Sequence, residues 1–368
     1  MKFLLLLFLS LMVQAVAFSK DTSNAVLTYT VAGLSHGHSH WIFQDKFKGD
    51  YSIVGIYEPD QALAKNFQDQ YNLNSDLFYS DLGQMLDQLK PDGVLAFGPV
   101  YDHLKVVEEA APRGIHVMVE KPLAANWDHA LKMGKLAQDH SIYLLTNYET
   151  SWYPSTEATY QQLQDEEQFG VIRKAVFHHG HKGPKEIGVG PEFFEWLTDP
   201  KLNGGGVLMD FGCYGANIMT YLLDGKKPIA VTAITQTHKP QIYTQVEDEA
   251  TILVTYEGAQ AIIQASWNWP FDRKDMEVYG SKGQVFALNP NHIEIRSPKT
   301  DGKIQTDSLL DKEVYTNPFE YFAQVIRGKI QIPSHGLYAL ENNMTVMEIL
   351  EAAKISAQTG KTVELPLN

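Results

Sequence analysis

The stretch VLTYTVAGLSHGHSH, residues 26–40, decides how the first half of the chain folds. Its apolar start, rich in Val, Leu, Tyr and Thr, predicts a β-strand that ends at Gly33, where a polar loop begins. The following WIFQDKF segment, residues 41–47, predicts a helix that starts near His38. A strand, a glycine-bearing loop and a helix in this order are typical of a site that binds nucleotide phosphates at the helix N-terminus.

The alternation of strands and helices continues to about residue 147. Further apolar strands are predicted at residues 51–58, 93–98, 116–122 and 142–148, and the helical segments between them lie at residues 60–72, 81–89, 102–114 and 126–140. Nearly continuous apolar strands that alternate with helices indicate a parallel sheet covered on both faces. We therefore predict an α/β Rossmann domain with a doubly wound parallel sheet over residues 25–147.

From about residue 148 the pattern changes to strands in which polar and apolar residues alternate. These strands are predicted at residues 171–181, 228–238, 248–257, 260–269, 275–281, 284–289 and 292–297. A period of two with short turns predicts an α+β domain with a mostly antiparallel sheet over residues 148–337. Residues 338–368 are predicted to form a C-terminal helix and tail that pack back on the Rossmann domain.

The first 17 residues have the pattern of a secretory signal peptide. Lys2 precedes an apolar run, and Ala15-Val16-Ala17 forms a small-residue cleavage site. We therefore predict a cleaved leader and a secreted or periplasmic protein. The formal net charge of −14 argues against nucleic acid or an anionic membrane as a partner. The single cysteine, Cys213, excludes an intramolecular disulfide.

The glycine loop departs from the usual dinucleotide fingerprint. In the G-x-G-x-x-G frame only Gly33 is in place, because Ser35 and His38 replace the second and third glycines. The position after the first strand still predicts cofactor contact by the loop residues Gly33, Ser35, His36, Gly37 and His38. Glu58 ends the second strand, where a carboxylate can bind the adenosine ribose and repels a 2′-phosphate. The loop therefore predicts NAD, with NADP less favoured.

His36, His38 and His40 raise the alternative of a metal site. Such a site needs ligands that converge on one ion, whereas these histidines lie in a loop that enters a helix, with no acidic or cysteine residue beside them in the sequence. We predict no metal. A contact between one histidine and a phosphate, or histidines that only pack or face solvent, both remain open.

The stretch VMVEKPLA, residues 117–124, ends the fourth predicted strand with a Glu-Lys-Pro triplet. The carboxyl ends of the strands in a doubly wound sheet form the edge that binds ligands. Residues at or just after strand ends on this edge are predicted to contact the cofactor, namely Phe97, Gly98, His103, Glu120 and Lys121. Lys121 should lie near the nicotinamide ring, and His103 could instead cap the helix that follows its strand.

A second stretch with candidate catalytic residues is LNGGGVLMDFGCYGANIM, residues 202–219. Its three glycines allow the backbone to pass close to another group, and a helix is predicted to begin near Gly206. Asp210, Tyr214 and Asn217 follow at spacings of four and three, which places them on one face of that helix. A polar stripe on an apolar helix predicts either the wall of a site or a capped packing element.

These motifs together resemble the glucose–fructose oxidoreductase and inositol dehydrogenase family, often called Gfo/Idh/MocA. The resemblance rests on the strand–loop start, the Glu-Lys-Pro triplet, GGGVLMDFGCYG and the tail EAAKISAQTGKTVEL, and it spans essentially the whole chain after the leader. It implies a Rossmann domain, a second domain with a large open sheet, tightly bound NAD(P), and sugar or polyol substrates. It also implies a homo-oligomer, a dimer or tetramer, and makes Lys121 the catalytic lysine.

The helix motif differs from the family pattern D-x-G-x-H-x-x-D, because Tyr214 replaces the histidine and Asn217 the second aspartate. The glucose–fructose oxidoreductase branch also has a tyrosine at this place. We expect Tyr214 to accept the proton of a sugar hydroxyl, with Lys121 lowering its pKa. Asp210 is expected to orient the sugar or Lys121, and Asn217 to bind a second hydroxyl.

The FHHGHKG segment, residues 177–183, ends the first strand of the second domain near the expected sugar. His179 and His181 are its predicted substrate contacts, with histidines that only face solvent as the alternative. The SWNWPF segment, residues 266–271, could stack on a sugar face. Aromatic side chains are more often buried, however, and we expect these in the core.

The predicted activity is hydride transfer between a sugar or polyol and NAD(P) by an exported oxidoreductase. Because little free NAD is available outside the cytoplasm, we expect the cofactor to stay bound and to be regenerated there. One alternative is a glycoside hydrolase that transiently oxidises a sugar carbon and then eliminates the leaving group. Another is a sugar-binding protein without activity, against which the presence of Lys121 and Tyr214 argues.

Overall fold

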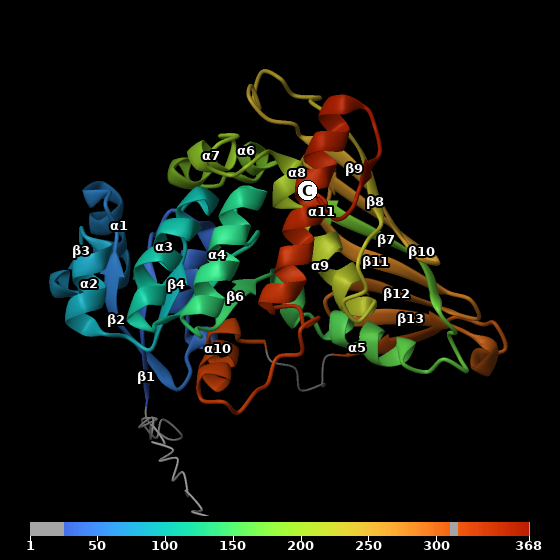
Figure 1. Ribbon diagram of the computed structural model, residues 1–368, viewed down its shortest axis with the longest axis horizontal. Helices are drawn as coiled ribbons and strands as arrows, with labels where there is room; N and C mark the ends of the chain where they lie inside the picture. Colours follow the sequence, from blue (N-terminus) through green and yellow to red (C-terminus); the bar gives the residue numbers. More distant parts are fainter. Residues whose placement is uncertain (1–25, 310–315, 368) are drawn as a thin grey trace, which may run out of the picture.

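The computed structural model describes residues 26–309 and 316–367, so the predicted leader at residues 1–17 lies outside the described residues. The described chain forms two domains, each built on one sheet (Figure 1). The predicted combination of a parallel α/β domain with a mostly antiparallel α+β domain is confirmed. Over these described ranges, we find no helix that is long and apolar enough to cross a membrane.

The first domain is a six-stranded parallel sheet with the order β3-β2-β1-β4-β5-β6. Its strands are β1 (Leu27–Ala32), β2 (Tyr51–Tyr57), β3 (Phe78–Tyr79), β4 (Gly93–Ala96), β5 (His116–Glu120) and β6 (Leu144–Asn147). Its main helices are α1 (Gln61–Tyr71), α2 (Leu82–Leu89), α3 (His103–Ala110) and α4 (Trp127–Asp139). Strand order reverses between β1 and β4, and such a reversal opens a ligand crevice at the carboxyl edge.

The helix predicted to start near His38 is present only as two 3₁₀ segments, η1 (Gly37–Phe43) and η2 (Asp45–Phe47). Their sequence contains glycine, serine, histidine and aromatic residues, which are poor helix formers. The side chain of His36 caps η1, because its Nδ1 accepts a hydrogen bond from the backbone N–H of His38 (3.0 Å).

The second domain is a nine-stranded sheet with the order β14-β13-β12-β11-β7-β10-β9-β8-β15. Its strands are β7 (Ile172–Gly180), β8 (Ala230–Gln236), β9 (Glu249–Tyr256), β10 (Ala259–Ser266), β11 (Arg273–Gly280), β12 (Gln284–Asn289), β13 (His292–Arg296), β14 (Gln305–Ser308) and β15 (Val363–Glu364). Neighbouring strands are antiparallel except β7 and β10, which are parallel.

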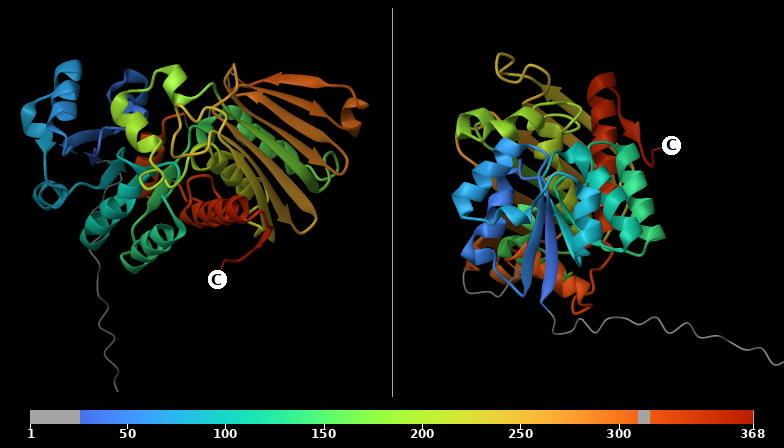
Figure 2. Two further views of the ribbon diagram at one scale, coloured as in Figure 1. Left: turned by 90° about the horizontal axis from the view of Figure 1, so that it is seen from above. Right: turned by 90° about the vertical axis from the view of Figure 1, so that its left-hand side faces the viewer.

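Helices cover the face of this sheet that is turned toward the first domain (Figure 2). They are α5 (Pro154–Leu163), α9 (Gly212–Leu222) and α11 (Leu340–Thr359). The short helices α6 (Pro184–Ile187) and α7 (Pro191–Leu197) lie above the first domain in Figure 1. The helix predicted from Gly206 is broken at Phe211 into α8 (Val207–Asp210) and α9, so Asp210 and Tyr214 belong to different helices.

The C-terminal part of the chain is shared between the domains. Helix α11 packs on α4 and β6 of the Rossmann domain, as the sequence predicted, and also on α9 and β8 of the second domain. Helix α10 (Pro318–Ile326), assigned from the sequence to the second domain, packs on the first, where Phe322 stacks on Tyr29 (5.4 Å between ring centroids). An apolar stripe shows that a helix face is buried but not which domain buries it.

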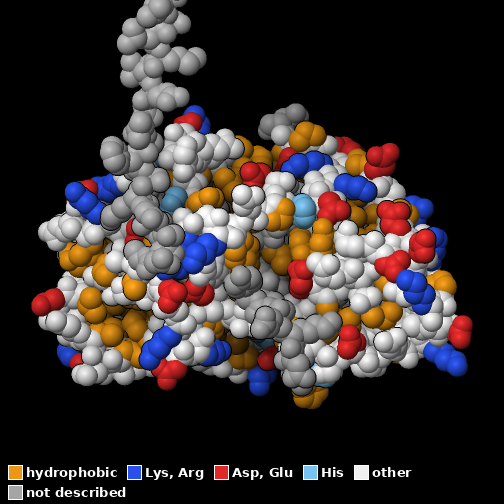
Figure 3. All heavy atoms as spheres, turned by 90° about the horizontal axis from the view of Figure 1, so that it is seen from below, with side chains coloured by type: hydrophobic (Ala, Val, Ile, Leu, Met, Phe, Trp, Pro, Cys, Tyr) orange, Lys and Arg blue, Asp and Glu red, His pale blue; other side chains and the backbone are white. Residues whose placement is uncertain are grey.

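The lower face of the molecule carries the amino ends of the parallel strands. Figure 3 shows acidic and basic side chains interspersed on this face, beside scattered hydrophobic ones. A mixed surface of this kind gives no large field of one sign that would attract a polyanion.

Candidate active site

A cavity of about 270 Å³ opens at the carboxyl edge of the parallel sheet, between the two domains. We call it the interdomain cavity. Its polar wall residues are His36, His38, Lys121, His181, Asp210, Tyr214, Asp272 and Lys274. Apolar residues of α6, α7 and the segment between them close one side. The loop after β1, the end of β5 and α8 and α9 of the second domain therefore meet around one space, as the sequence predicted for Lys121, Asp210 and Tyr214.

Lys121 and Asp210 form a buried ion pair across the domain boundary. The Nζ of Lys121 bonds to the Oδ1 of Asp210 and also donates to its backbone carbonyl (3.2 Å), and each side chain is 7% exposed. Burial alone would lower the pKa of Lys121, but the Asp210 carboxylate raises it above its usual value. Burial alone would raise the pKa of Asp210, but the Lys121 ammonium holds it below its usual value. Both groups are therefore charged at neutral pH.

The glycine triplet makes this approach possible. Gly204 has a φ of 87°, which favours glycine, and a Cβ there would overlap the carbonyl oxygen of Ala125. The segment that leads into α8 therefore packs directly on the loop after β5, and this contact brings Asp210 to Lys121. The side chain of Glu247 caps α8 by accepting hydrogen bonds from two backbone N–H groups at its start (2.9 and 3.0 Å).

Trp267 fixes the other oxygen of Asp210. Its Nε1 donates to Oδ2 (2.9 Å), and the indole is fully buried. The predicted core position of this tryptophan is confirmed, although its bond to Asp210 was not predicted. Phe271 is 80% exposed, so the core prediction is wrong for that residue, which lies in the loop between β10 and β11.

Tyr214 lies in the cavity wall between two lysines. The Nζ of Lys121 lies 5.4 Å from the centroid of its ring, and the Nζ of Lys274 lies 5.3 Å from it. Burial first, and the Glu149 carboxylate second, raise the pKa of Tyr214 well above its usual value. The prediction that Lys121 lowers this pKa is wrong, because the residue is only 2% exposed and its loss of hydration outweighs the nearby ammonium.

The two predicted substrate histidines have different positions. His181 lines the interdomain cavity, and its Nδ1 accepts a hydrogen bond from the backbone N–H of Gly183 (2.9 Å). His179 is 1% exposed behind Tyr214, whose ring stacks on it with centroids 5.3 Å apart, and burial lowers its pKa to about 3. The predicted substrate contact is wrong for His179, because Tyr214 covers it, and stays a prediction for His181.

Asn217 does not reach the cavity. Its Nδ2 donates to the carbonyl of Leu337 (2.8 Å) and to the Oδ1 of Asn342 (3.0 Å), and the residue is fully buried. The predicted substrate contact is therefore wrong. A step of three residues turns a helical side chain by about 60° from that of Tyr214, and here the turn aims Asn217 at α11.

A narrower cavity of about 70 Å³ lies under the loops after β1 and β4, and we call it the crevice. Five of the predicted cofactor residues line it, namely Gly33, Ser35, Glu58, Gly98 and His103. Gly33 has a φ of 84°, and a Cβ there would lie 2.7 Å from the Cα of Gly98. The two loops are therefore packed as closely as backbones allow, with room for glycine alone.

Two buried atoms in the crevice residues lack a partner among the residues that the structure describes. They are the Oγ of Ser35 and the Nε2 of His103. The Nδ1 of His103 donates to the Leu123 carbonyl (3.1 Å), so its Nε2 keeps a lone pair, and burial lowers its pKa to about 4. Buried polar atoms without partners are costly. A hydroxyl donor and an imidazole acceptor in this place fit the phosphates and hydroxyls of a dinucleotide.

Two further predicted cofactor residues, Phe97 and Gly37, do not place a side chain in the crevice. The side chain of Phe97 packs in the core on Phe319 (6.1 Å between ring centroids), and its carbonyl accepts from the N–H of His36 (2.8 Å). The Phe97 ring points inward, away from the crevice, so the predicted cofactor contact of Phe97 stays a prediction only for its backbone. Gly37 is exposed at the start of η1, and its predicted contact with the cofactor stays a prediction.

Glu58 holds the glycine loop in place. Its two oxygens accept hydrogen bonds from the backbone N–H groups of Leu34 (2.8 Å) and Asp60 (2.9 Å). Burial raises the pKa of Glu58, although these hydrogen bonds oppose the shift. Each carboxylate oxygen can accept a second hydrogen bond, so the predicted contact with a ribose stays possible in the crevice.

The histidine loop does gather a cluster of metal-binding atoms. Donor atoms of His36, His38 and Glu120 lie within 4.8 Å of one another. The Nδ1 atoms of both histidines already take part in hydrogen bonds, because the His36 Nδ1 accepts from the His38 backbone and the His38 Nδ1 lies 3.0 Å from Glu120. Asn147 donates to the other oxygen of Glu120 (2.8 Å). These bonds hold the cluster together and let Glu120 orient His38, and the predicted absence of a metal stays a prediction.

One charged pair at the cavity was not predicted from the sequence. Glu149 begins η6 (Glu149–Trp152), directly after β6, and forms an ion pair with Lys274 of β11. Lys274 lies just before the strand predicted at residues 275–281, whereas the observed β11 begins at Arg273 and places Lys274 on the same face as Met276 and Val278. A lysine on the apolar face of a strand needs a partner or a function, but this signal is visible only once the strand is extended to Lys274.

Comparisons with known proteins match both domains of the chain. The family model described as oxidoreductase family, NAD-binding Rossmann fold, matches residues 27–148. The model described as GFO/IDH/MocA C-terminal domain matches residues 158–286. The two matches fall on the two observed domains, in the same order along the chain.

Curated relatives and solved structures extend the comparison. An NADP(+)-dependent D-xylose 1-dehydrogenase from Haloarcula marismortui is 25% identical over 281 residues, or 74% of this chain and 74% of that protein. A scyllo-inositol 2-dehydrogenase (NADP(+)) from Bacillus subtilis is 20% identical over 310 residues, or 83% of this chain and 89% of that protein.

The aldose-aldose oxidoreductase from Caulobacter crescentus has a TM-score of 0.76 at 23% identity, over 92% of this chain and 99% of that one. An inositol dehydrogenase homologue from Azotobacter vinelandii, complexed with NAD+, has a TM-score of 0.78 at 18% identity, over 93% of this chain and 98% of that one. At such identities these structures show a shared fold. Because models for both domains match over most of the described chain, the protein belongs to the Gfo/Idh/MocA family of NAD(P)-dependent oxidoreductases.

Proposed function

We propose that the protein transfers a hydride between a sugar or polyol and NAD. The observation that carries this proposal is the buried Lys121–Asp210 pair beside Tyr214, in a cavity at the edge of the sheet where the crevice also opens. Relatives named as xylose and inositol dehydrogenases support the substrate class.

The chain offers a division of roles in which Tyr214 is the acid. With its pKa raised, Tyr214 stays protonated and can donate its proton to a carbonyl oxygen, while Lys121 stabilises the negative charge that develops there. Asp210 and Trp267 hold Lys121 in place. The dinucleotide, when bound, supplies or accepts the hydride. In the oxidation direction Tyr214 must first lose its own proton before it can take the proton of a substrate hydroxyl.

The activity test compares free sugars with glycosides. Purified protein is incubated with free aldoses and polyols plus NAD+, and separately with chromogenic glycosides. The proposal predicts reduced nicotinamide with a free sugar or polyol and no cleavage of glycosides. Release of the chromogenic group without net change in the cofactor would instead support a hydrolase, and sugar binding without either reaction a binding protein.

Glu58 supports NAD over NADP. Its carboxylate is 5% exposed and lines the crevice, where it would repel a 2′-phosphate. Both dehydrogenase relatives described above are named for NADP(+), which makes a direct comparison necessary. On protein freed of its bound dinucleotide, fluorescence titrations should give an affinity for NADH about tenfold or more above that for NADPH. Equal affinities would contradict this assignment.

Export and tight cofactor binding form a further part of the proposal, supported by the leader pattern at residues 1–17. Mass spectrometry of the exported protein should find Phe18 at the amino terminus. Protein purified without added cofactor should still carry a dinucleotide in its absorbance spectrum. A cytoplasmic protein with an intact leader, or a cofactor that dialysis removes, would contradict this part.

We also propose a homo-oligomer formed through the outer face of the nine-stranded sheet. No helix of the described residues covers that face (Figure 2). Val176, Ile262 and Leu253 are half-buried neighbours on adjacent central strands there, opposite to the buried inner residues. Light scattering should show a dimer or tetramer, and Ile262→Glu should give monomers. A wild-type monomer would contradict the assignment.

A further inference from the structure

The inner face of β11 carries a lysine among apolar residues. Lys274 shares one face of β11 with the buried residues Met276 and Val278, and it lies opposite His179 of β7 in the sheet. Its side chain is 25% exposed, and the residue lines the interdomain cavity. The lysine is therefore part of the cavity wall rather than of the outer surface.

The partner of this lysine comes from the segment that follows β6, the last strand of the parallel sheet. Its Nζ forms an ion pair with Glu149, which also accepts a hydrogen bond from the hydroxyl of Tyr153 (2.7 Å). Burial alone would raise the pKa of Glu149, but Lys274 and the Tyr153 bond bring it to about 2. The Lys274–Glu149 pair therefore consists of two full charges that cancel each other at neutral pH.

The cavity holds a second pair of the same kind. Lys121 is neutralised by Asp210, and the Tyr214 ring lies 5.4 Å from the Lys121 ammonium and 5.3 Å from that of Lys274. Each ammonium that faces the cavity thus has its own carboxylate.

The other titratable residues of the wall add no uncompensated cation. Burial lowers the pKa values of His36, His38 and His181, which leaves these rings neutral near pH 7. Asp272 adds an exposed carboxylate at the rim. The wall as a whole therefore carries no excess positive charge for an anionic ligand.

Stability does not account for the Lys274–Glu149 pair. Partly buried ion pairs lose hydration, and an apolar pair of similar size often stabilises a protein as well or better. Charged groups that are kept in a cleft despite this cost indicate a functional site.

We propose that Lys274, neutralised by Glu149, binds a substrate hydroxyl away from the reacting carbon and so selects neutral sugars and polyols over sugar acids and sugar phosphates. This inference rests on the proposed function and defines its substrate class. Glu149 takes one of the three ammonium protons, and two remain for hydroxyl oxygens. An anionic substituent at the same place would gain little from the compensated ammonium and would approach the Glu149, Asp210 and Asp272 carboxylates.

The test compares ligands that differ by one carboxylate. Xylitol is paired with D-xylonate and D-glucitol with D-gluconate, and binding is measured by titration calorimetry on the full protein saturated with NADH, which reduces none of them. The wild type should bind each polyol about tenfold or more tightly than its acid. Glu149→Gln should shift this ratio toward the acid by about tenfold, and Lys274→Met should weaken polyol binding by about tenfold.

Lys282→Met is the matched control. Lys282 is an exposed lysine that follows β11, and its Nζ bonds to the backbone carbonyl of Glu166 (3.1 Å). This variant should leave both affinities unchanged, and Lys274→Arg, which keeps the charge, should retain the wild-type ratio. Thermal unfolding confirms that each variant is folded, and Lys274→Met alone decides the matter if Glu149→Gln does not fold.

The inference is overturned if the wild type binds acids as tightly as polyols, or if folded Glu149→Gln and Lys274→Met variants keep the wild-type affinities. Turnover of sugars and polyols with NAD+ is measured separately. The predicted binding preference without any turnover would keep the inference and reject the proposed reaction. Turnover together with unchanged variants would reject the inference alone.

Discussion

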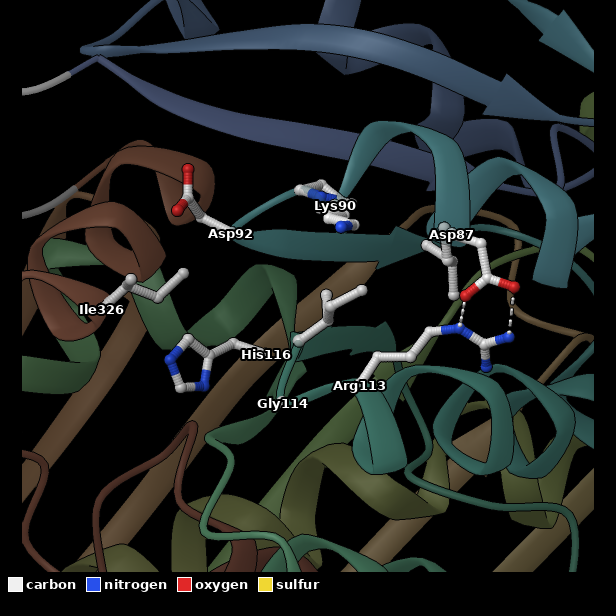
Figure 4. Close-up of a pocket in the computed structure, with 10 residues that line it drawn as sticks. Asp87, Lys90, Asp92, Arg113, Gly114, His116 and Ile326 are labelled. Atoms are coloured by element: carbon white, nitrogen blue, oxygen red, sulfur yellow. Dashed lines mark hydrogen bonds and ion pairs between the residues drawn. The ribbon is translucent and has the colours of Figure 1, made fainter. Parts of the chain in front are cut away.

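The parallel sheet has a cavity at its amino edge that is larger than the interdomain cavity at its carboxyl edge, yet the interdomain cavity is the candidate active site. The cavity at the amino edge has a volume of about 550 Å³, whereas the interdomain cavity at the carboxyl edge has about 270 Å³. At the amino edge Arg113 forms two hydrogen bonds with Asp87 (2.8 and 3.1 Å; Figure 4), and Asp92 accepts from the backbone N–H of Thr28 (2.8 Å).

The two edges differ in how their charges are used. The Arg113–Asp87 pair at the amino edge is partly exposed and lies within one domain, so both of its charges also reach solvent. The pairs at the carboxyl edge join residues 89 and 125 positions apart in the chain, are more deeply buried, and lie beside the crevice with its unpartnered Ser35 and His103 atoms. Volume therefore identifies a site less well than buried charges and unpartnered polar atoms do.

The largest expected difference between the edges is in turnover. Lys121→Met should lower kcat by about a thousandfold or more, because it removes the charge that stabilises the developing oxyanion. The affinity for NADH should change by less than about threefold. Arg113→Met at the amino edge is the matched control and should leave both values unchanged. Normal turnover in folded Lys121→Met, or an equal loss in Arg113→Met, would remove the distinction between the edges.

The next largest effect is on the pH dependence of the reaction rate, which the protonation state of Tyr214 should control. A pKa raised by burial means that the phenolate fraction grows with pH, so sugar oxidation should rise from pH 7 to pH 10 without a plateau, while carbonyl reduction should not. Tyr214→Phe should lower both rates by about a hundredfold and remove the pH dependence of oxidation. A pH–rate profile of the wild type that is already flat at pH 7 would show a lowered pKa instead.

A smaller effect is expected behind the cavity wall. Asn217→Ala removes two buried hydrogen bonds that tie α9 to the region of α11, and it should lower the free energy of unfolding by about 2 kcal/mol. The KM for the sugar should not change. Denaturant unfolding and steady-state kinetics would check both points. A raised KM in a variant of wild-type stability would show instead that Asn217 contacts the substrate.

The smallest effect concerns the crevice. Ser35→Ala removes a buried hydroxyl that has no protein partner, so it should weaken NADH binding by about three- to tenfold. Stability without the cofactor should stay the same or rise slightly. A large loss of stability without the cofactor, with NADH affinity intact, would mean that the hydroxyl serves the fold.

Much of the first domain could be predicted, because its strands β1, β2, β4, β5 and β6 are apolar runs long enough to be read directly. The two-residue β3 is too short to show a pattern. Helix α10 could not be placed, since its apolar face fits either domain, and Phe322 reaches Tyr29 only through the long-range fold.

The candidate site was predictable where a residue is placed by a strand end. Lys121 follows β5, so its position at the carboxyl edge depends on topology alone. The directions of Tyr214 and Asn217 depend on the break at Phe211 and on how α9 packs beside α11, which no local spacing reveals. The Lys274–Glu149 pair joins residues 125 positions apart, and no local motif contains both.

The most direct test is a crystal structure of the full protein with NADH and a polyol. The nicotinamide ring should bind in the interdomain cavity, with the polyol between the ring and Tyr214 and with a hydroxyl within hydrogen-bonding distance of the Lys121 Nζ. A nicotinamide ring that binds away from Lys121, or at the amino-edge cavity beside Arg113, would contradict this arrangement.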